Sequence, residues 1–259
     1  MLLWFSFCYS NNMFNFPEQI NRHIKDKKYE DVSCRSNAKT YHFENGLFLK
    51  IDDKGELKRE CLMTNVFYKL GFGSKVVEYV SEDKDYLLTE EVVGENLTHL
   101  IEKPEKLCAF LAESLKKLHS ISIKDIPIST RYERYLESLN GSFEGGYYDT
   151  SFLLNSKNLT KEEAWKIMQD NKSMLKCDAF IHGDACLPNL IVCGDNFKAF
   201  IDTGMAGVGD RHIDLYWALW SLEYNLKTDK YNEFFKEIYG KEKIDDNKLK
   251  VIEAFEVFG

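Results

Sequence analysis

The strongest constraint on this chain of 259 residues is a cluster of polar residues between positions 182 and 204. His182-Gly183-Asp184 is followed, five residues after the aspartate, by Asn189. Two short apolar stretches come next, Leu190–Cys193 and Phe197–Ile201, and the second one leads into Asp202-Thr203-Gly204. Because Gly194-Asp195-Asn196 separates the two stretches, they predict an antiparallel β-hairpin with polar side chains at its open end.

The register of this hairpin decides which polar side chains meet. If the chain turns between Asp195 and Asn196, Asn189 lies opposite Asp202. Directly opposed residues on antiparallel strands have Cβ atoms about 4.5–5.5 Å apart. An amide oxygen and a carboxylate would then converge, which suits a hard divalent cation with oxygen ligands. Asp184 lies on the loop that enters the hairpin, where its carboxylate is placed to hold a hydroxyl nucleophile.

Two charged residues upstream strengthen this interpretation. Lys50 lies in the apolar segment Leu47–Ile51, and Glu60 lies in the segment Glu56–Leu70, which has helical spacing and ends before Gly71. Each alone would more often be a solvated surface charge. Their order before the polar cluster instead predicts an ion pair between a strand lysine and a helix glutamate.

The remaining pattern indicates a small mixed region followed by a helical one. Strands are expected at Lys39–Phe43, Leu47–Ile51, Lys75–Val80 and Asp85–Thr89, and a first helix at Phe16–Lys27. From Pro104 onward we expect helices from the Leu107–Leu118 stripe, at Tyr132–Leu139, after the capping box Thr160–Glu163, and at Ile213–Leu226, Lys230–Tyr239 and Asp246–Phe258. Asn140–Asn158 is expected to be a loop.

Composition excludes several classes of protein. The net charge of −8 argues against a nucleic-acid binder, and no apolar run approaches the roughly 20 residues of a membrane-spanning helix. Seven scattered cysteines without a CxxC pair are typical of a reducing compartment, so we expect a cytoplasmic protein with no membrane partner. The apolar start lacks the features of a signal peptide, and translation from Met13 is expected instead. Seven acids and two bases between Asp178 and Glu223 concentrate the negative charge around the polar cluster.

The segment 182–189, HGDACLPN, resembles the catalytic loop of bacterial aminoglycoside 3′-phosphotransferases. The resemblance continues through Phe200–Gly204 and Asp210–Asp214, and it includes Leu87–Gly94 and Glu256-Val257-Phe258. It implies a bilobal α+β fold of the protein-kinase type. An N-terminal nucleotide-binding lobe (residues 1–94, with five strands, one helix and the hinge) would precede a larger, mainly helical catalytic lobe (residues 95–259), with the nucleotide between them.

The resemblance also implies a role for each matching residue. Asp184 would orient the acceptor hydroxyl and act as base, supported by His182 and Asp214. Asn189 and Asp202 would bind Mg²⁺, and Lys50, fixed by Glu60, would hold the phosphates of ATP, or of GTP as an alternative donor. The remaining contacts to the nucleotide would come from the backbone of Ser36, Asn37, Glu90 and Val92. The cationic aminoglycoside would be bound by Asp149, Glu223, Glu256 and Phe258.

Some residues depart from the family's pattern. Met205 stands where the 3′ enzymes carry an arginine, Phe255 replaces the first residue of an acidic pair, and the chain ends one residue later, at Gly259. These departures leave phosphoryl transfer intact and keep a second substrate class open: another small hydroxylated molecule, such as an amino alcohol, a sugar or another antibiotic. A non-catalytic nucleotide-binding protein and a protein kinase are weaker alternatives. The first would not need the complete set of site residues, and the second would carry a glycine-rich phosphate loop. The sequence does not give the oligomeric state.

Overall fold

The computed structural model describes residues 16–34, 37–154, 156 and 158–259. The chain forms two compact units, the first ending at Val93 and the second running from Gly94 to Gly259. Among the helices of these described residues, none combines the length and the apolar character needed to cross a bilayer.

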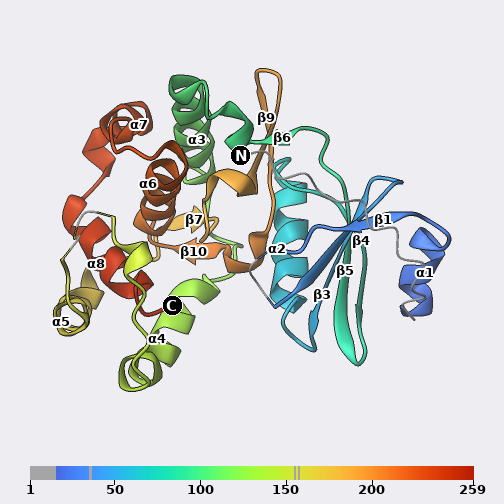
Figure 1. Cartoon of the computed structure of the whole chain (residues 1–259), viewed down its shortest axis with the longest axis horizontal. Coiled ribbons are helices and arrows are strands. Elements are labelled where there is room, and N and C mark those ends of the chain that lie inside the picture. Colours follow the sequence, from blue (N-terminus) through green and yellow to red (C-terminus); the bar gives the residue numbers. More distant parts are fainter. Residues whose placement is uncertain (1–15, 35–36, 155, 157) are drawn as a thin grey trace. The chain divides into compact units, whose positions relative to one another are not determined.

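The first unit contains a five-stranded antiparallel sheet with the strand order β1-β2-β3-β5-β4 (Figure 1). Its elements are α1 (Glu18–Ile24), β1 (Tyr29–Asp31), β2 (Lys39–Phe43), β3 (Leu47–Asp53), α2 (Lys58–Lys69), β4 (Val76–Ser81) and β5 (Lys84–Glu90). The four strands expected from the residue pattern are all present. The fifth, β1, has only three residues and no apolar alternation, so the local sequence carries no signal for it.

The two faces of this sheet have different partners. Ile20 and Ile24 of α1 pack against Leu49 of β3 on one face, in a cluster of buried apolar side chains. Successive side chains of a strand point to opposite faces, so Lys50 faces the other side, where its ammonium contacts Glu60 of α2. The alternation along β3 therefore assigns one residue to the core and the next to the candidate site.

The second unit is mainly helical and carries two small sheets, β6-β8-β9 and β7-β10. Its helices are α3 (Pro104–Leu118), α4 (Thr130–Glu144), α5 (Lys161–Asn171), α6 (His212–Leu226), α7 (Asn232–Tyr239) and α8 (Asp246–Glu256). Its strands are β6 (Glu95–Asn96), β7 (Ala179–Ile181), β8 (Leu190–Cys193), β9 (Asn196–Phe200) and β10 (Gly207–Gly209). The helix α6 is buried along most of its length, as its uniformly apolar sequence predicts. The capping box that opens α5 is confirmed, because the Thr160 and Glu163 side chains each accept from the other's backbone N–H.

The helices α4, α5 and α8 share one apolar cluster, which corrects the expectation of a loop from Asn140 (Figure 1). The helix α4 starts earlier than expected and continues through Asn140-Gly141 to Glu144. Its last turn is supported by Phe143, whose ring stacks on Trp165 of α5 with centroids 4.3 Å apart. Tertiary packing thus outweighs the poor helix propensity of the Asn-Gly pair.

The register predicted for the hairpin is wrong by at least one residue. Cys193 pairs with Asn196, so Gly194-Asp195 forms a two-residue turn in which Gly194 has a φ of 59°. Glycine adopts this backbone conformation without steric cost, so the chain turns at Gly194-Asp195 and not between Asp195 and Asn196. An irregularity between Ile191 and Val192 then shifts the pairing back by one residue, which leaves it one residue away from the prediction. As a result the carbonyl of Asn189 accepts from the N–H of Ile201, and Asp202, the predicted partner of Asn189, lies one residue beyond Ile201.

Candidate active site

In the first unit, the predicted ion pair between Lys50 and Glu60 is present. The Lys50 ammonium donates to Glu60 Oε2 at 2.8 Å. The Lys50 and Glu60 side chains are only 20% and 11% exposed, so water weakens their attraction less than it weakens a surface salt bridge. Glu60 thereby holds the lysine ammonium in a fixed position on the α2 face of the sheet.

A buried aspartate that the sequence analysis missed anchors the helix carrying Glu60. Leu57, which precedes α2, offers no side-chain cap, and its backbone N–H donates instead to Asp85 Oδ2 at 2.9 Å. Tyr79 donates its hydroxyl to the same oxygen at 2.9 Å. Burial alone would raise the pKa of Asp85, but hydrogen bonds from Ser81, from backbone N–H groups and from Tyr79 lower it. The start of α2 is therefore capped by the side chain of Asp85 from the strand β5.

In the second unit, the structure brings Asp184 and Asn189 together. Asn189 donates from Nδ2 to the Asp184 carbonyl at 3.0 Å and to Asp184 Oδ2 at 3.1 Å. The Cys186 thiol donates to the other carboxylate oxygen at 3.1 Å. Burial, and the nearby charge of Asp184, raise the pKa of Cys186 well above its usual value, so this thiol remains protonated. The Asp184 carboxylate is thus oriented by two donors within its own loop.

The loop conformation depends on Gly183. Its φ of 83° lies in the left-handed region, and a Cβ at this position would lie 2.1 Å from the backbone carbonyl oxygen of Met205. No side chain fits such a contact, because real Cβ atoms do not approach a carbonyl oxygen so closely. Gly183 therefore allows the loop that carries Asp184 to pack directly on the turn that follows Asp202.

A buried carboxylate, Asp214 at the start of α6, fixes the backbone of the same loop. It accepts from the N–H of His182 at 2.8 Å and from the N–H of Gly183 at 2.7 Å. His119, which ends α3, contacts Asp214 Oδ2 through Nε2 at 2.9 Å and Tyr239 through Nδ1 at 2.8 Å. Asp214 was predicted as a support, whereas His119 and Tyr239 were missed because they lie far from the motif in sequence.

His182 connects the loop to the end of the hairpin. Its Nε2 lies 2.9 Å from the carbonyl oxygen of Ile201, and its Nδ1 accepts from the N–H of Asp184 at 3.3 Å. A carbonyl can only accept and an N–H can only donate, so these contacts require a neutral imidazole with its proton on Nε2. His182 thus links the residue before Asp202 to the backbone of the candidate base.

Asp202 has an unusual backbone conformation, with φ 56° and ψ 58°. A non-glycine residue in this region is strained by about 1–2 kcal/mol, and such residues concentrate at functional sites. Its side chain is exposed, and it follows the hairpin that Asn189 begins. Asn189 Nδ2 donates both of its hydrogen bonds to Asp184, so the side-chain amide oxygen of Asn189 is the atom that can bind a cation. A carboxylate and an amide oxygen are a donor set that fits Mg²⁺, which keeps several waters and substrate phosphates as its other ligands.

Four residues of the first unit are expected to contact the nucleotide through their backbone atoms. Ser36 lies outside the described residues, and Asn37 is exposed. Glu90 ends β5, and its carboxylate accepts from Lys75 at 2.9 Å. Val92 is partly buried just before the end of the first unit. The roles of these four residues stay predictions.

The residues expected to bind the acceptor all contact other parts of the second unit. Asp149 caps the short 3₁₀-helix Thr150–Phe152, and Glu223 accepts from Asn232 Nδ2 at 2.6 Å. Phe258 is buried against the rings of Phe143, Tyr148 and Trp165. Glu256 is 1% exposed and accepts from Arg131, Tyr135 and Trp217. These contacts assign each residue a structural function, and their roles toward an acceptor stay predictions.

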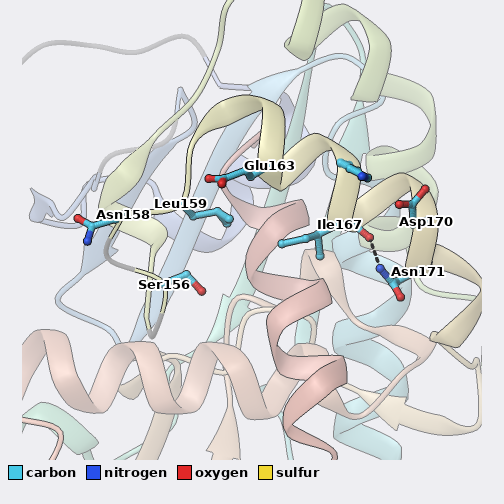
Figure 2. A pocket seen from close by; sticks show the side chains of 8 residues that line it. Ser156, Asn158, Leu159, Glu163, Ile167, Asp170 and Asn171 are labelled. Carbon is cyan, nitrogen blue, oxygen red and sulfur yellow. Dashed lines mark hydrogen bonds between the residues drawn. The ribbon is translucent and has the colours of Figure 1, made fainter.

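Described residues of the second unit line grooves, and two of these are defined by their lining residues. One of them, about 580 Å³, runs along α5 and the segment before it, with Glu163, Ile167 and Asp170 among its lining residues (Figure 2). The smaller, about 310 Å³, is lined by Gly94, Glu95, His99, Leu100, Val192, Cys193 and Gly194. Neither groove is lined by any of the site residues predicted from the sequence.

Comparison with known proteins identifies the family of the chain. The family model of the phosphotransferase enzyme family matches residues 33–248. A probable aminoglycoside 3′-phosphotransferase of Lactococcus lactis is 38% identical over 253 residues, covering 96% of this chain and 97% of that protein. The aminoglycoside 3′-phosphotransferase of Niallia circulans is 33% identical over 168 residues, covering 64% of each chain.

Solved structures show that the fold is shared as well. The aminoglycoside phosphotransferase APH(3″)-Id from Streptomyces rimosus superposes with a TM-score of 0.74 at 17% identity, covering 93% of this chain and 96% of that one. An aminoglycoside-3′-phosphotransferase of type VIII gives a TM-score of 0.69 at 21% identity, covering 90% and 94%. The predicted bilobal α+β fold of the protein-kinase type is therefore confirmed. With its family model matched over most of its length and a full-length relative at 38% identity, the chain belongs to the phosphotransferase enzyme family, among the aminoglycoside 3′-phosphotransferases.

Proposed function

We propose that this enzyme transfers the γ-phosphoryl group of ATP to the 3′-hydroxyl of an aminoglycoside, and so confers resistance. The observation that supports this most is the loop around Asp184. Its carboxylate is held by Asn189 and Cys186, while its backbone is held by His182 and Asp214. So many supports around one half-buried carboxylate are typical of a group that must meet a reacting atom in a fixed geometry.

In this reaction Asp184 accepts a hydrogen bond from the acceptor hydroxyl and orients its oxygen toward the γ-phosphorus. The bond between that oxygen and phosphorus forms while the bond from phosphorus to the β–γ bridging oxygen breaks, and ADP leaves. The hydroxyl proton passes to the Asp184 carboxylate. Because phosphoryl transfer consists mostly of positioning and charge stabilisation, the proton moves late, and orientation is the main contribution of Asp184.

The other site residues handle the phosphate charge. Lys50, held by Glu60, donates to the α- and β-phosphates, and Ser36, Asn37, Glu90 and Val92 contribute the backbone contacts described above. Asn189 and Asp202 hold Mg²⁺ through their side-chain oxygens. When bound, this ion neutralises the charge that develops on the phosphate oxygens. The strained backbone of Asp202 fixes the direction of its carboxylate.

The acceptor is inferred from relatives. The most similar proteins described above carry the name aminoglycoside 3′-phosphotransferase, and a structural neighbour was solved with ADP and streptomycin. Another neighbour was solved with GDP and kanamycin, so GTP remains a second candidate donor. The free thiols found among the described residues suit a cytoplasmic location, where nucleotide donors are present.

A kinase of another small hydroxylated molecule is the second candidate. It is favoured by the state of Glu256, because a carboxylate that is 1% exposed and fully paired within the protein offers little to a cationic drug. An amino alcohol or a sugar would place fewer positive charges against this part of the protein.

The test is an ADP-release assay with purified enzyme, Mg²⁺ and ATP or GTP, across kanamycin, neomycin, streptomycin, amino alcohols and sugars. We expect release above the drug-free background with kanamycin or neomycin, and a phosphate ester at the 3′ position by NMR of the product. Turnover with only an amino alcohol or a sugar would assign the second function. Absence of turnover with every acceptor, despite nucleotide binding, would contradict both.

A further inference from the structure

A buried cluster around Arg131 is not explained by the chemistry of phosphoryl transfer. Arg131 donates from Nη2 to Glu256 Oε2 at 2.5 Å and from Nε to Oε1 at 3.1 Å. Tyr135 and Trp217 also donate to Oε1, the latter at 2.6 Å. The guanidinium carbon lies 4.7 Å from the centroid of the Trp217 ring. Removing two charges from water is costly, so a buried ion pair with this many partners calls for a functional reason.

The position of Arg131 in the fold suggests that reason. It is the second residue of α4, and the residues before it contact the turn after Asp202. Thr130 Oγ1 donates to the Gly204 carbonyl at 3.3 Å, and Ser129 Oγ donates to the Met205 carbonyl at 3.4 Å. The same turn packs on Gly183, beside Asp184. The start of α4 thus places Arg131 near the turn that packs beside Asp184, the candidate base.

The pKa of Arg131 reflects the charges around its side chain. Burial alone would lower the pKa of Arg131, but the Glu256 carboxylate, the Tyr135 hydroxyl and, more weakly, the Asp184 carboxylate raise it well above its usual value. The Arg131 charge in turn acts on Cys186, in the Asp184 loop. Arg131 is therefore a permanent cation within electrostatic reach of Asp184.

The contacts also leave Arg131 with unused donors. Its hydrogen bonds within the described residues involve only Nε and Nη2, so the Nη1 donors have no partner there. The side chain keeps 14% of its surface exposed, whereas the Glu256 side chain keeps 1%. Of the two side chains, Arg131 is therefore the one that keeps contact with solvent, whereas the Glu256 carboxylate is occupied by partners within the protein.

We propose that Arg131 determines acceptor specificity. It occupies the Glu256 carboxylate and presents its own N–H donors. The site therefore selects an acceptor that carries a hydroxyl, rather than an amino group, where the acceptor contacts the Arg131 guanidinium. This inference rests on the proposed function and refines it. A hydroxyl oxygen can accept from the guanidinium, whereas an ammonium is repelled by it and has no free carboxylate to bind.

The experiment compares matched acceptors that differ by one hydroxyl against one amino group, namely paromomycin with neomycin and kanamycin A with kanamycin B. For the full-length enzyme and for R131Q, kcat/KM and the dissociation constant are measured for all four, and thermal melting checks the fold. In R131Q, glutamine cannot neutralise Glu256, so we expect the hydroxyl-over-amino ratio to fall about tenfold or more in at least one pair. R134Q is the matched control, because Arg134 is an exposed arginine on the same helix, and its ratios should match those of the wild type.

A second variant keeps the proposal testable if the unpaired Glu256 unfolds R131Q. The double substitution R131Q with E256Q removes both charges at once, and we expect the hydroxyl preference to disappear while the fold is retained. Ratios within twofold of the wild type in both pairs, measured with whichever variant folds, would overturn the proposal and leave the proposed function intact. If the wild type neither binds nor phosphorylates any of the four acceptors, the proposed function fails and the specificity role fails with it.

Discussion

Asp214 accepts the backbone N–H of Gly183 at 2.7 Å, and through this contact the fully buried start of α6 supports the loop that carries Asp184. The same carboxylate binds the N–H of His182 and the ring of His119. Three donors therefore share one carboxylate, which ties the loop that carries Asp184 to α3 and α6 at once.

Replacing this carboxylate with an amide should damage both stability and activity. Asp214→Asn leaves one acceptor oxygen for three donors and points an NH₂ group at some of them. We expect a loss of about 2–4 kcal/mol in the free energy of unfolding, measured by urea denaturation. We also expect kcat to fall by about tenfold or more, because the Asp184 loop loses its anchor. A variant with wild-type kcat would show that the anchor does not position the loop.

Substitution of Lys50 should act mainly on nucleotide use. Lys50→Ala removes the ammonium that Glu60 holds, so we expect KM for the nucleotide to rise about tenfold or more. KM for the acceptor should change little. Lys84→Ala is the control, because Lys84 is half exposed and pairs weakly with Asp53 at 3.5 Å. Equal effects of the two substitutions on nucleotide KM would refute the role of Lys50.

A single methyl group at position 183 should prevent the loop that carries Asp184 from adopting its conformation. Gly183→Ala would place Cβ 2.1 Å from the Met205 carbonyl oxygen, in a backbone conformation with φ 83°. We expect lost activity and a lower melting temperature. Gly194→Ala is the matched control, because Gly194 also has positive φ (59°) but no atom within 4 Å of the added Cβ. That variant should lose only about 1 kcal/mol and remain active.

The pH dependence of stability should contain a contribution from Asp210. This carboxylate is 3% exposed and accepts from His212 Nδ1 at 2.6 Å, from Lys248 at 2.7 Å and from the N–H of Lys176 at 2.8 Å. Burial by itself raises the pKa of Asp210, but these hydrogen bonds lower it further than burial raises it. The ionised Asp210 carboxylate therefore stabilises the folded state fully at pH values above the pKa of an aspartate in the unfolded chain, about 3.9. This stabilisation is lost as pH falls from there toward the lower pKa of Asp210 in the folded protein.

This contribution can be isolated by urea denaturation of the wild type and Asp210→Asn between pH 6 and pH 3. The difference in free energy of unfolding should be constant down to about pH 4 and then shrink by up to about 1.4 kcal/mol per pH unit. A difference that stays constant to pH 3 would contradict a lowered pKa for Asp210.

The sequence predicted those parts of the site that depend on local order along the chain. The pairing of Lys50 with Glu60, and the closeness of Asn189 to Asp184, follow from a strand beside a helix and from a short loop. The hairpin register was wrong because a glycine turn and a local irregularity shift it, and neither follows from a two-residue alternation. Arg131 and His119 were missed because their partners lie 125 and 95 residues away. Only the packing of the helices brings such residues together.

The most direct test of the central claim is the rate of ADP release by Asp184→Asn compared with the wild type, at saturating ATP, Mg²⁺ and kanamycin or neomycin. The account predicts at least about a hundredfold lower acceptor-dependent turnover in the variant, with nucleotide binding retained within about threefold, because a neutral amide replaces the carboxylate that orients the acceptor hydroxyl and takes its proton. Acceptor-dependent turnover at the wild-type rate in Asp184→Asn would contradict it.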